Sequence, residues 1–381
     1  MEKIKAIFYF INEWWHENFF TGHAAPQSRG PEELDRIYLE RKRFLFENFG
    51  EFGQGEEEPE MDGQYANLFV KWGMDIISYV LGGELFAHDA GGYCVVPQDK
   101  ERLGRLKPVD IADTDFAEWI VRRKGYLEER YGSAGQMQIL ETSLNVATRL
   151  GGQEFYIALG TDKPFASHLL ETIAETTALA YRFFCKEFVM PDVNLTNCAV
   201  NHISSDMYEE MCLKNDIYLA EDTRDLFPHT KRHVLLHSCD LPADRLVDSY
   251  AKVPRVYRFE ASYRTDVKRF YEKMPDAYFA AFVNPVDLVQ LPEEELARML
   301  SDKTRDGVRE WIFWGIDPYC SAGRLKKAMR FVQQACSANG FEAELEVTPF
   351  NFDELEWSFP KWQGDGVYSI EGAKRLPVDV N

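Results

Sequence analysis

A histidine and a cysteine separated by one residue are the side chains in this sequence best placed for chemistry. They are His237 and Cys239, and they follow the apolar run Val234-Leu235-Leu236, which predicts a β-strand. Because residues i and i+2 of a strand point to the same face, the imidazole and the thiol are expected to project together. Both are zinc ligands, and a catalytic zinc typically keeps three protein ligands and one open position. The pair therefore predicts a zinc site at the end of this strand.

A third ligand is predicted at Cys320, just after the strand-like run at 310–317. Cysteines are also common as small core residues, so packing is the alternative interpretation of any single thiol, the pair included. The remaining cysteines are interpreted as packing residues or bystanders: Cys94, Cys185, Cys198, Cys212 and Cys336.

The charge balance narrows the class of protein. The chain has 381 residues, with 43 Lys and Arg against 63 Asp and Glu, for a net charge of −20. Such a field repels phosphate backbones and anionic lipid heads, which argues against nucleic-acid and membrane partners. An odd number of scattered cysteines favours a reducing compartment. The apolar run at 6–11 is interrupted by Asn12 and Glu13, so no signal peptide is predicted, and a cytoplasmic protein is expected.

Strand-like and helix-like segments alternate over most of the chain. Strands are expected at 192–200, 233–240, 255–262, 276–285 and 310–317. Helices are expected at 32–49, at 66–82, from Asp162 and Pro164 to about Phe188, and at 324–338. This alternation predicts an α/β fold with a parallel sheet, and the length favours a (β/α)₈ barrel over an open doubly wound sheet. No glycine-rich phosphate motif follows any of the strands, which argues against dinucleotide binding.

These residues resemble those of a known family. The segments at 233–240, 280–300 and 314–329 look like the uroporphyrinogen decarboxylase superfamily, and within it the zinc-dependent corrinoid methyltransferases. That branch, which includes methylcobalamin:coenzyme M methyltransferases, has a His-x-Cys motif at a strand end, matched by His237 and Cys239. It also has an Ile-Ser-Pro-x-x-Tyr-like motif, similar to residues 203–208. The resemblance runs from about residue 135 to 338 and implies a (β/α)₈ barrel over 111–381, lidded by an amino-terminal helical and loop region at 1–110.

Several positions depart from the family pattern. Asp240 replaces a glycine after the His-x-Cys motif, and Cys320 lies beyond Trp314, where the family normally has its last cysteine. Glu260, at the end of the strand at 255–262, is therefore an alternative oxygen ligand. Asn197 stands where relatives often have an acid, and it is a candidate to hydrogen-bond the substrate, although a turn asparagine with satisfied hydrogen bonds fits the sequence as well.

The resemblance implies a methyltransferase with His237, Cys239 and Asn197 as catalytic residues. Zinc would activate a thiol toward a cobalt-bound methyl group, or polarise a methoxy oxygen. The corrinoid would come on a partner protein, selected in part by the acidic surface. Aromatic residues of the amino-terminal region would either line a pocket for the methyl compound or pack in the core: Phe8, Phe10, Trp14, Trp15, Phe19 and Phe20. The alternatives are a metal-free decarboxylase of a porphyrinogen-like substrate and a non-catalytic barrel with a structural zinc.

Overall fold

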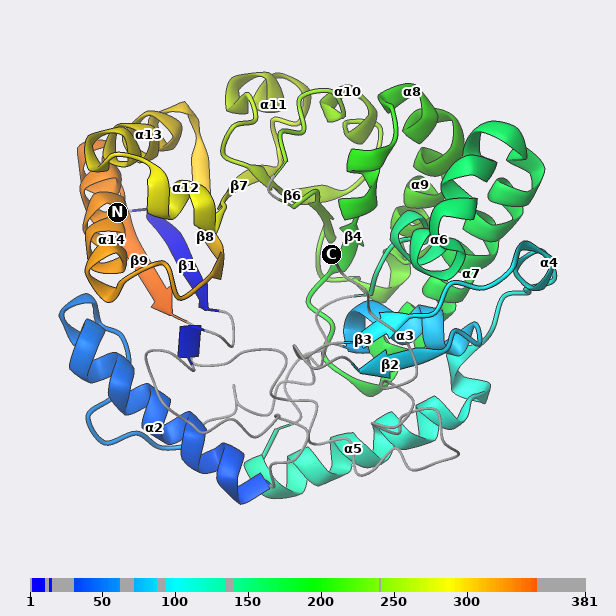
Figure 1. The fold of residues 1–381 in the computed structure, drawn as a ribbon, viewed down its shortest axis with the longest axis horizontal. Coiled ribbons are helices and arrows are strands. Elements are labelled where there is room, and N and C mark those ends of the chain that lie inside the picture. The colour runs from blue at the N-terminus through cyan, green and yellow to red at the C-terminus, as the bar shows by residue number, and fades with distance from the viewer. Residues whose placement is uncertain are drawn as a thin grey trace.

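A curved parallel sheet forms the centre of the molecule (Figure 1). The computed structural model describes residues 2–10, 14–15, 31–61, 72–87, 93–133, 140–239 and 241–347. The seven strands of the sheet are β1 (Lys3–Phe10), β4 (Val193–Thr196), β5 (Val234–His237), β6 (Val256–Ser262), β7 (Tyr278–Val283), β8 (Val308–Ile316) and β9 (Glu342–Val347). A separate small hairpin pairs β2 (Leu85–Ala87) with β3 (Tyr93–Val95) in antiparallel fashion.

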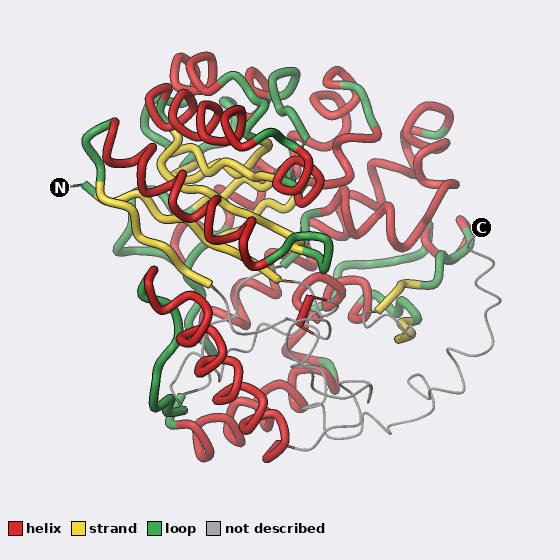
Figure 2. The backbone as a smooth tube through the Cα atoms, turned by 60° about the vertical axis from the view of Figure 1, so that its left-hand side comes forward, coloured by secondary structure: helices red, strands yellow, loops and turns green. Residues whose placement is uncertain are grey.

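Helices surround this sheet: most cover its outer side, whereas the long helices at 31–49 and 115–131 lie below it in the view of Figure 1 (Figures 1 and 2). The first group comprises α2 (Pro31–Phe49), α3 (Trp72–Val80), α4 (Lys100–Leu103), α5 (Asp115–Tyr131), α6 (Ser143–Thr161) and α7 (Lys163–Glu187). The second comprises α8 (Ser205–Met207), α9 (Leu213–Asp222), α10 (Val247–Tyr250), α11 (Val267–Lys273), α12 (Pro285–Gln290), α13 (Glu293–Asp306) and α14 (Ala322–Ala338). Within the described part of the chain, none of these helices combines the length and apolar character that crossing a membrane requires.

The order of the strands is β4-β5-β6-β7-β8-β1-β9, and every neighbouring pair is parallel. An isolated parallel bridge from Glu141 to Thr196 continues the pairing beyond β4. The predicted α/β class with parallel strands and crossover helices is therefore confirmed. Closure of the sheet into an eight-stranded barrel stays a prediction, because the described residues show no pairing between β9 and the segment at Glu141.

The amino-terminal strand lies inside the sheet. Residues 3–10 were expected in a lid region at 1–110, but they form β1 between β8 and β9. Their side chains alternate between the two faces, and Ile4, Ala6, Phe8 and Phe10 are buried in the main core. This strand was missed because its apolar run is short and the charged Lys3 and Lys5 precede it.

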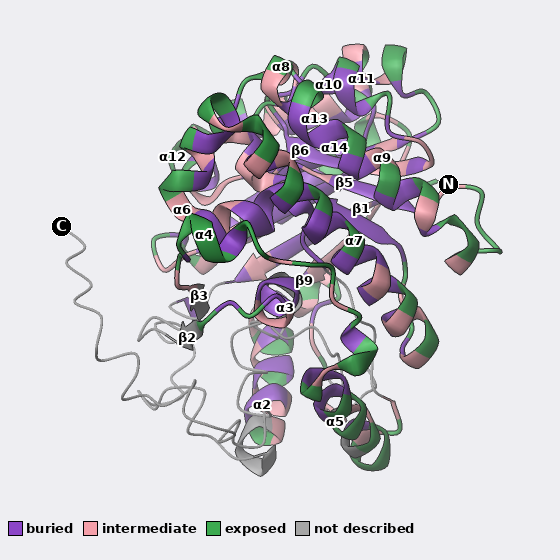
Figure 3. Ribbon diagram, turned by 90° about the vertical axis from the view of Figure 1, so that its right-hand side faces the viewer, coloured by how far each residue is buried: buried purple, intermediate pink, exposed green. Residues whose placement is uncertain are grey.

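Two hydrophobic clusters distinguish the two faces of the sheet. The outer face belongs to the large core, which the helices complete, and Figure 3 shows β1, β5 and β6 buried beneath them. The inner face has a small separate cluster of Ala280, Phe282 and Ile312, with Tyr9 and Tyr278 packed against it. The rest of the inner face is polar, because Thr196, Glu260 and Glu310 are buried on it. The inner face is the one on which the candidate site lies.

Candidate metal centre

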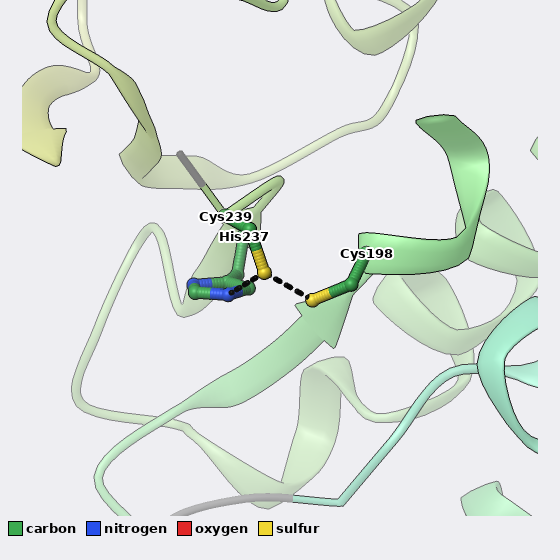
Figure 4. Close-up of side chains that lie close together, drawn as sticks. All are labelled: Cys198, His237 and Cys239. Carbon is green, nitrogen blue, oxygen red and sulfur yellow. Dashed lines mark hydrogen bonds between the residues drawn. The ribbon is translucent and has the colours of Figure 1, made fainter. Parts of the chain in front are cut away.

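Three side chains meet at the carboxyl ends of two neighbouring strands (Figure 4). The ligand atoms of Cys198, His237 and Cys239 all lie within 4.8 Å of one another. The two Sγ atoms are 2.6 Å apart, and Nε2 of His237 is 3.2 Å from Sγ of Cys239. Two thiols and one imidazole are a donor set that fits zinc, and three donors leave one coordination position for another molecule.

The local backbone explains how the three side chains converge. Strand β5 ends at His237, and Cys239 lies just beyond it with φ of 49°, in the left-handed region. The expected pairing of His237 with Cys239 is therefore produced by a turn rather than by strand alternation. Cys198 is the first residue of the 3₁₀ helix Cys198–His202 that follows β4. The backbone N–H of Asn197 donates to the carbonyl of His237 at 2.8 Å and ties the two strand ends together.

A carboxylate lies behind the histidine. Oε2 of Glu260 is 2.5 Å from Nδ1 of His237, and its Oε1 is 2.7 Å from the guanidinium of Arg258. Arg258 also pairs with Glu310 at 2.8 Å. The carboxylate occupies Nδ1 and leaves Nε2 toward the thiols, which is the arrangement that orients metal-binding histidines. Glu260, considered above as an oxygen ligand, thus contacts the far nitrogen of the His237 ring and is not one of the three residues whose ligand atoms converge.

Asn197 has protein partners for its side-chain amide. Its Nδ2 donates to Oδ2 of Asp216 at 2.7 Å, and its Oδ1 accepts from the hydroxyl of Thr142 at 2.8 Å. The hydroxyl of Tyr208 donates to the same Oδ2 at 2.5 Å. Such a buried network holds the end of β4 in place. Asn197 therefore lies next to the cluster in a positioning role, and the structure shows no contact that would test the predicted hydrogen bond to substrate.

Cys320, the predicted third ligand, lies outside the cluster of Cys198, His237 and Cys239. Its side chain is fully buried in the main core, and its backbone carbonyl accepts a hydrogen bond from Nε1 of Trp14 at 3.0 Å. Burial raises the pKa of this thiol to about 12, so it stays protonated and apolar. Among the described residues, the group that could hold a metal contains Cys198 and not Cys320.

The charges of the cluster reinforce one another. Burial opposes a charge on His237, but contacts with Cys198 and Glu260 outweigh it and raise the pKa of the imidazole. The hydrogen bond between Cys239 and Cys198, supported by His237, outweighs burial and lowers the pKa of Cys198. A thiolate is the form of cysteine that binds metals and attacks carbon. The contacts of Cys198 with Cys239 and His237 therefore favour its reactive form.

The aromatic residues of the amino terminus pack in the core. Phe8, Phe10, Trp14 and Trp15 are all buried in the large outer cluster, with Phe8 stacked on Phe313 at 4.4 Å between ring centroids. These four residues therefore have the packing role that was the alternative interpretation. The other two, Phe19 and Phe20, lie outside the described residues, as does Asp240.

Cys198 was missed because it has no neighbouring ligand at a recognisable spacing. It was interpreted as a packing residue or bystander, yet it follows the predicted strand at 192–200, next to the strand of His237. The carboxyl ends of neighbouring parallel strands share one edge of the sheet, so a thiol there was the available signal.

Comparison with known proteins finds a similar fold but no similar sequence. No family model matches the chain, and no curated protein matches its sequence. Among solved structures, a methyltransferase from Methanosarcina mazei aligns with a TM-score of 0.57, covering 88% of this chain and 94% of that one. The sequence identity is 13%, so the similarity shows that the two proteins share a fold.

Proposed function

We propose that this chain is a zinc-dependent methyltransferase. It would move a methyl group between a small substrate, either a thiol or a methoxylated or methylated compound, and the cobalt of a corrinoid. The observation on which this proposal rests is the cluster of Cys198, His237 and Cys239 at the strand ends, with Glu260 bound to the far nitrogen of the histidine. The fold shared with a solved methyltransferase supports it.

The residues of the chain have separate roles in this proposal. Cys198, Cys239 and Nε2 of His237 would hold the metal, which when bound would keep a substrate thiol deprotonated at neutral pH or polarise a methoxy oxygen. Glu260 fixes the ring of His237 through Nδ1, and Arg258 fixes Glu260. Burial of this network excludes water, which strengthens each of these charged contacts.

The corrinoid would be bound to a separate partner protein. With a net charge of −20, the chain would favour a partner with a complementary basic surface. The thiols of the site need a reducing environment, so the protein is proposed to work in the cytoplasm.

Metal analysis of the purified chain tests the site. Protein prepared without added metal should contain close to one zinc per chain. Cys198→Ser, His237→Ala and Cys239→Ser should each lose it while keeping the circular dichroism of the fold. Cys320→Ser is the matched control, a buried thiol outside the cluster, and should keep its zinc. A wild-type protein without zinc would contradict the proposal and favour the decarboxylase alternative.

The absorption spectrum of methylcobalamin then tests the methyl-transfer activity. Adding the zinc-loaded chain and a thiol to methylcobalamin should convert the methylcobalt spectrum to that of the demethylated corrinoid. The Cys198→Ser protein should leave the spectrum unchanged. Full zinc occupancy with no spectral change for any thiol or methoxylated compound would instead indicate a structural zinc.

A further inference from the structure

The strand register places charged side chains on either side of His237. In-register partners in a parallel sheet point to the same face. On one side of His237 the register runs to Thr196 and then to Glu141. On the other side it runs to Glu260, Ala280 and Glu310. The inner face of the sheet therefore has buried carboxyl groups on both sides of the histidine.

Carboxyl groups outnumber the guanidinium groups that pair with them around this face. Arg149 pairs with both Glu141 and Asp75, and Arg258 pairs with both Glu260 and Glu310. Four carboxyl groups thus share two guanidinium groups. A zinc ion bound by two thiolates and a neutral imidazole would add no net charge. Oε2 of Glu141 is buried and has no hydrogen-bond partner among the residues that the structure describes.

An aromatic wall lies on the same face, nearer the strand ends. It consists of Tyr9, Phe282 and Trp314, from β1, β7 and β8. The ring centroids of His237 and Phe282 are 5.2 Å apart, those of Phe282 and Trp314 6.5 Å, and those of Tyr9 and Trp314 4.9 Å. Trp314 is 45% exposed, although it is a large aromatic residue at the end of a central strand. A dissolved molecule can therefore reach its ring.

We infer that this face binds a methylated onium cation, a quaternary ammonium or a sulfonium ion, beside the metal cluster. Aromatic faces attract such cations, and they give the methyl groups apolar contact. The excess carboxyl groups supply the opposite charge, which a neutral methoxy compound would leave unbalanced. An anionic compound would be repelled. The inference uses the proposed function only in taking the cluster as the place where a thiol is held.

A bound onium ion would give the chain a second, cobalt-free route to the same product. The sulfur of a substrate thiolate forms a bond to the methyl carbon while the bond from that carbon to nitrogen breaks. The electron pair of the broken bond stays on nitrogen, which leaves a neutral tertiary amine, or a neutral sulfide if the donor is a sulfonium. The proton of the thiol goes to solvent when the thiol binds, and no oxidant or reductant is needed. Opposite charges cancel in this step, which a buried site with little water favours.

Choline and its neutral carbon isostere, 3,3-dimethylbutan-1-ol, test the binding directly. Calorimetry on the full chain should show choline binding at least about tenfold more tightly than the alcohol, because only the cation gains from the aromatic faces and the carboxylates. Tetramethylammonium and trimethylsulfonium separate the two kinds of onium. Equal binding of choline and the alcohol, or no binding of any of these compounds at millimolar concentration, would overturn the inference.

Single substitutions locate the cation. Trp314→Leu keeps an apolar side chain but removes the aromatic face, and should weaken choline binding by about fivefold to thirtyfold while changing alcohol binding little. Glu141→Gln keeps the shape but removes a carboxyl group that can ionise beside a bound cation, and should act in the same direction. Tyr319→Leu is the matched control, since Tyr319 is exposed in the following loop and outside the wall. Unchanged choline binding in Trp314→Leu would contradict the inference.

The two proposals fail separately. Zinc is measured in every preparation used for calorimetry, so a chain without zinc contradicts the proposed function while the comparison of choline with its isostere still decides the cation site. Mass spectrometry of a thiol incubated with the zinc-loaded chain and an onium compound, without corrinoid, should show the methyl thioether. A zinc-loaded chain that binds choline but yields no thioether would overturn the cobalt-free route and leave the binding site standing.

Discussion

At the scale of single residues, the bond from Glu260 to Nδ1 of His237 decides which nitrogen faces the thiols. Glu260→Gln keeps the size of the side chain but weakens this bond, because a neutral amide replaces the carboxylate. We expect zinc affinity to fall by about tenfold to a hundredfold, measured by competition with a chromophoric chelator. Glu310→Gln is the control, since it also removes a partner of Arg258 without touching His237, and its affinity should change far less. Equal losses in both variants would assign the effect to Arg258.

Glu141 should make stability depend on pH. Burial raises its pKa from 4.5 to about 8, against the opposing effect of Arg149. The folded chain then holds this proton more tightly than the unfolded chain, so the stability is fully present below pH 4.5 and is lost as pH rises toward 8. Glu141→Gln does not lose stability in this way. Relative to the wild type, its free energy of unfolding should therefore rise by at most about 1.4 kcal/mol per pH unit.

Urea unfolding of the zinc-free protein at several pH values across that window measures the difference. The metal is left out because its charge would change the titration of nearby groups. Asp75 and Cys198 also face Glu141 and raise its pKa, so their own titration has to be followed in the same buffers. A constant difference between variant and wild type across the window would show that Glu141 titrates normally.

The sequence predicted members of the three-residue cluster only where two candidate ligands lie close together in the chain. His237 and Cys239 were found because one residue separates them, and the structure brings their ligand atoms together. Cys198 comes from a different strand, so its place depends on which strands are neighbours, and that is a property of the fold. Cys320 was chosen by its distance along the chain and lies in the core instead.

At the scale of elements, the start of α7 shows how a local signal fixes a helix. The side chain of Asp162 accepts from the backbone N–H of Phe165 at 3.3 Å, and Pro164 occupies the first turn. Asp162→Ala should lower the free energy of unfolding by about 1 kcal/mol, measured in urea. Asp162→Asn retains a capping oxygen and should lose less. Zinc content should not change in either variant, and an unaltered stability of Asp162→Ala would mean that packing alone fixes this helix.

Elements with such local signals were predicted well. α2, α7 and α14 lie where helical spacing and end signals placed them, and the strands β4 to β7 lie within the predicted runs. β8 begins two residues before the run predicted at 310–317. The short strand β1 was not predicted as part of the sheet, since two lysines and a short apolar run give a weak signal. Its pairing with β8 and β9 involves residues some 300 positions away, which no local pattern reports.

At the scale of the whole molecule, β1 makes the first residues part of the central sheet. A chain that begins at residue 111 would leave a gap between β8 and β9 and expose their unpaired edges. We expect it to lose cooperative thermal unfolding, followed by circular dichroism, and to be degraded rapidly by protease. Residues 1–110 added as a separate chain are the control and should restore part of the transition. A sharp transition from 111–381 alone would show that these residues form an independent domain.

The position of β1 also has a consequence for how the protein is made. Among the strands that the structure describes, β1 leaves the ribosome first, but its two partners, β8 and β9, are synthesised last. At ordinary rates of translation, the apolar residues of β1 wait roughly 15 to 60 s for their neighbours. During synthesis this strand is therefore a segment for chaperones to protect, and the described sheet can be completed only after β9 has emerged.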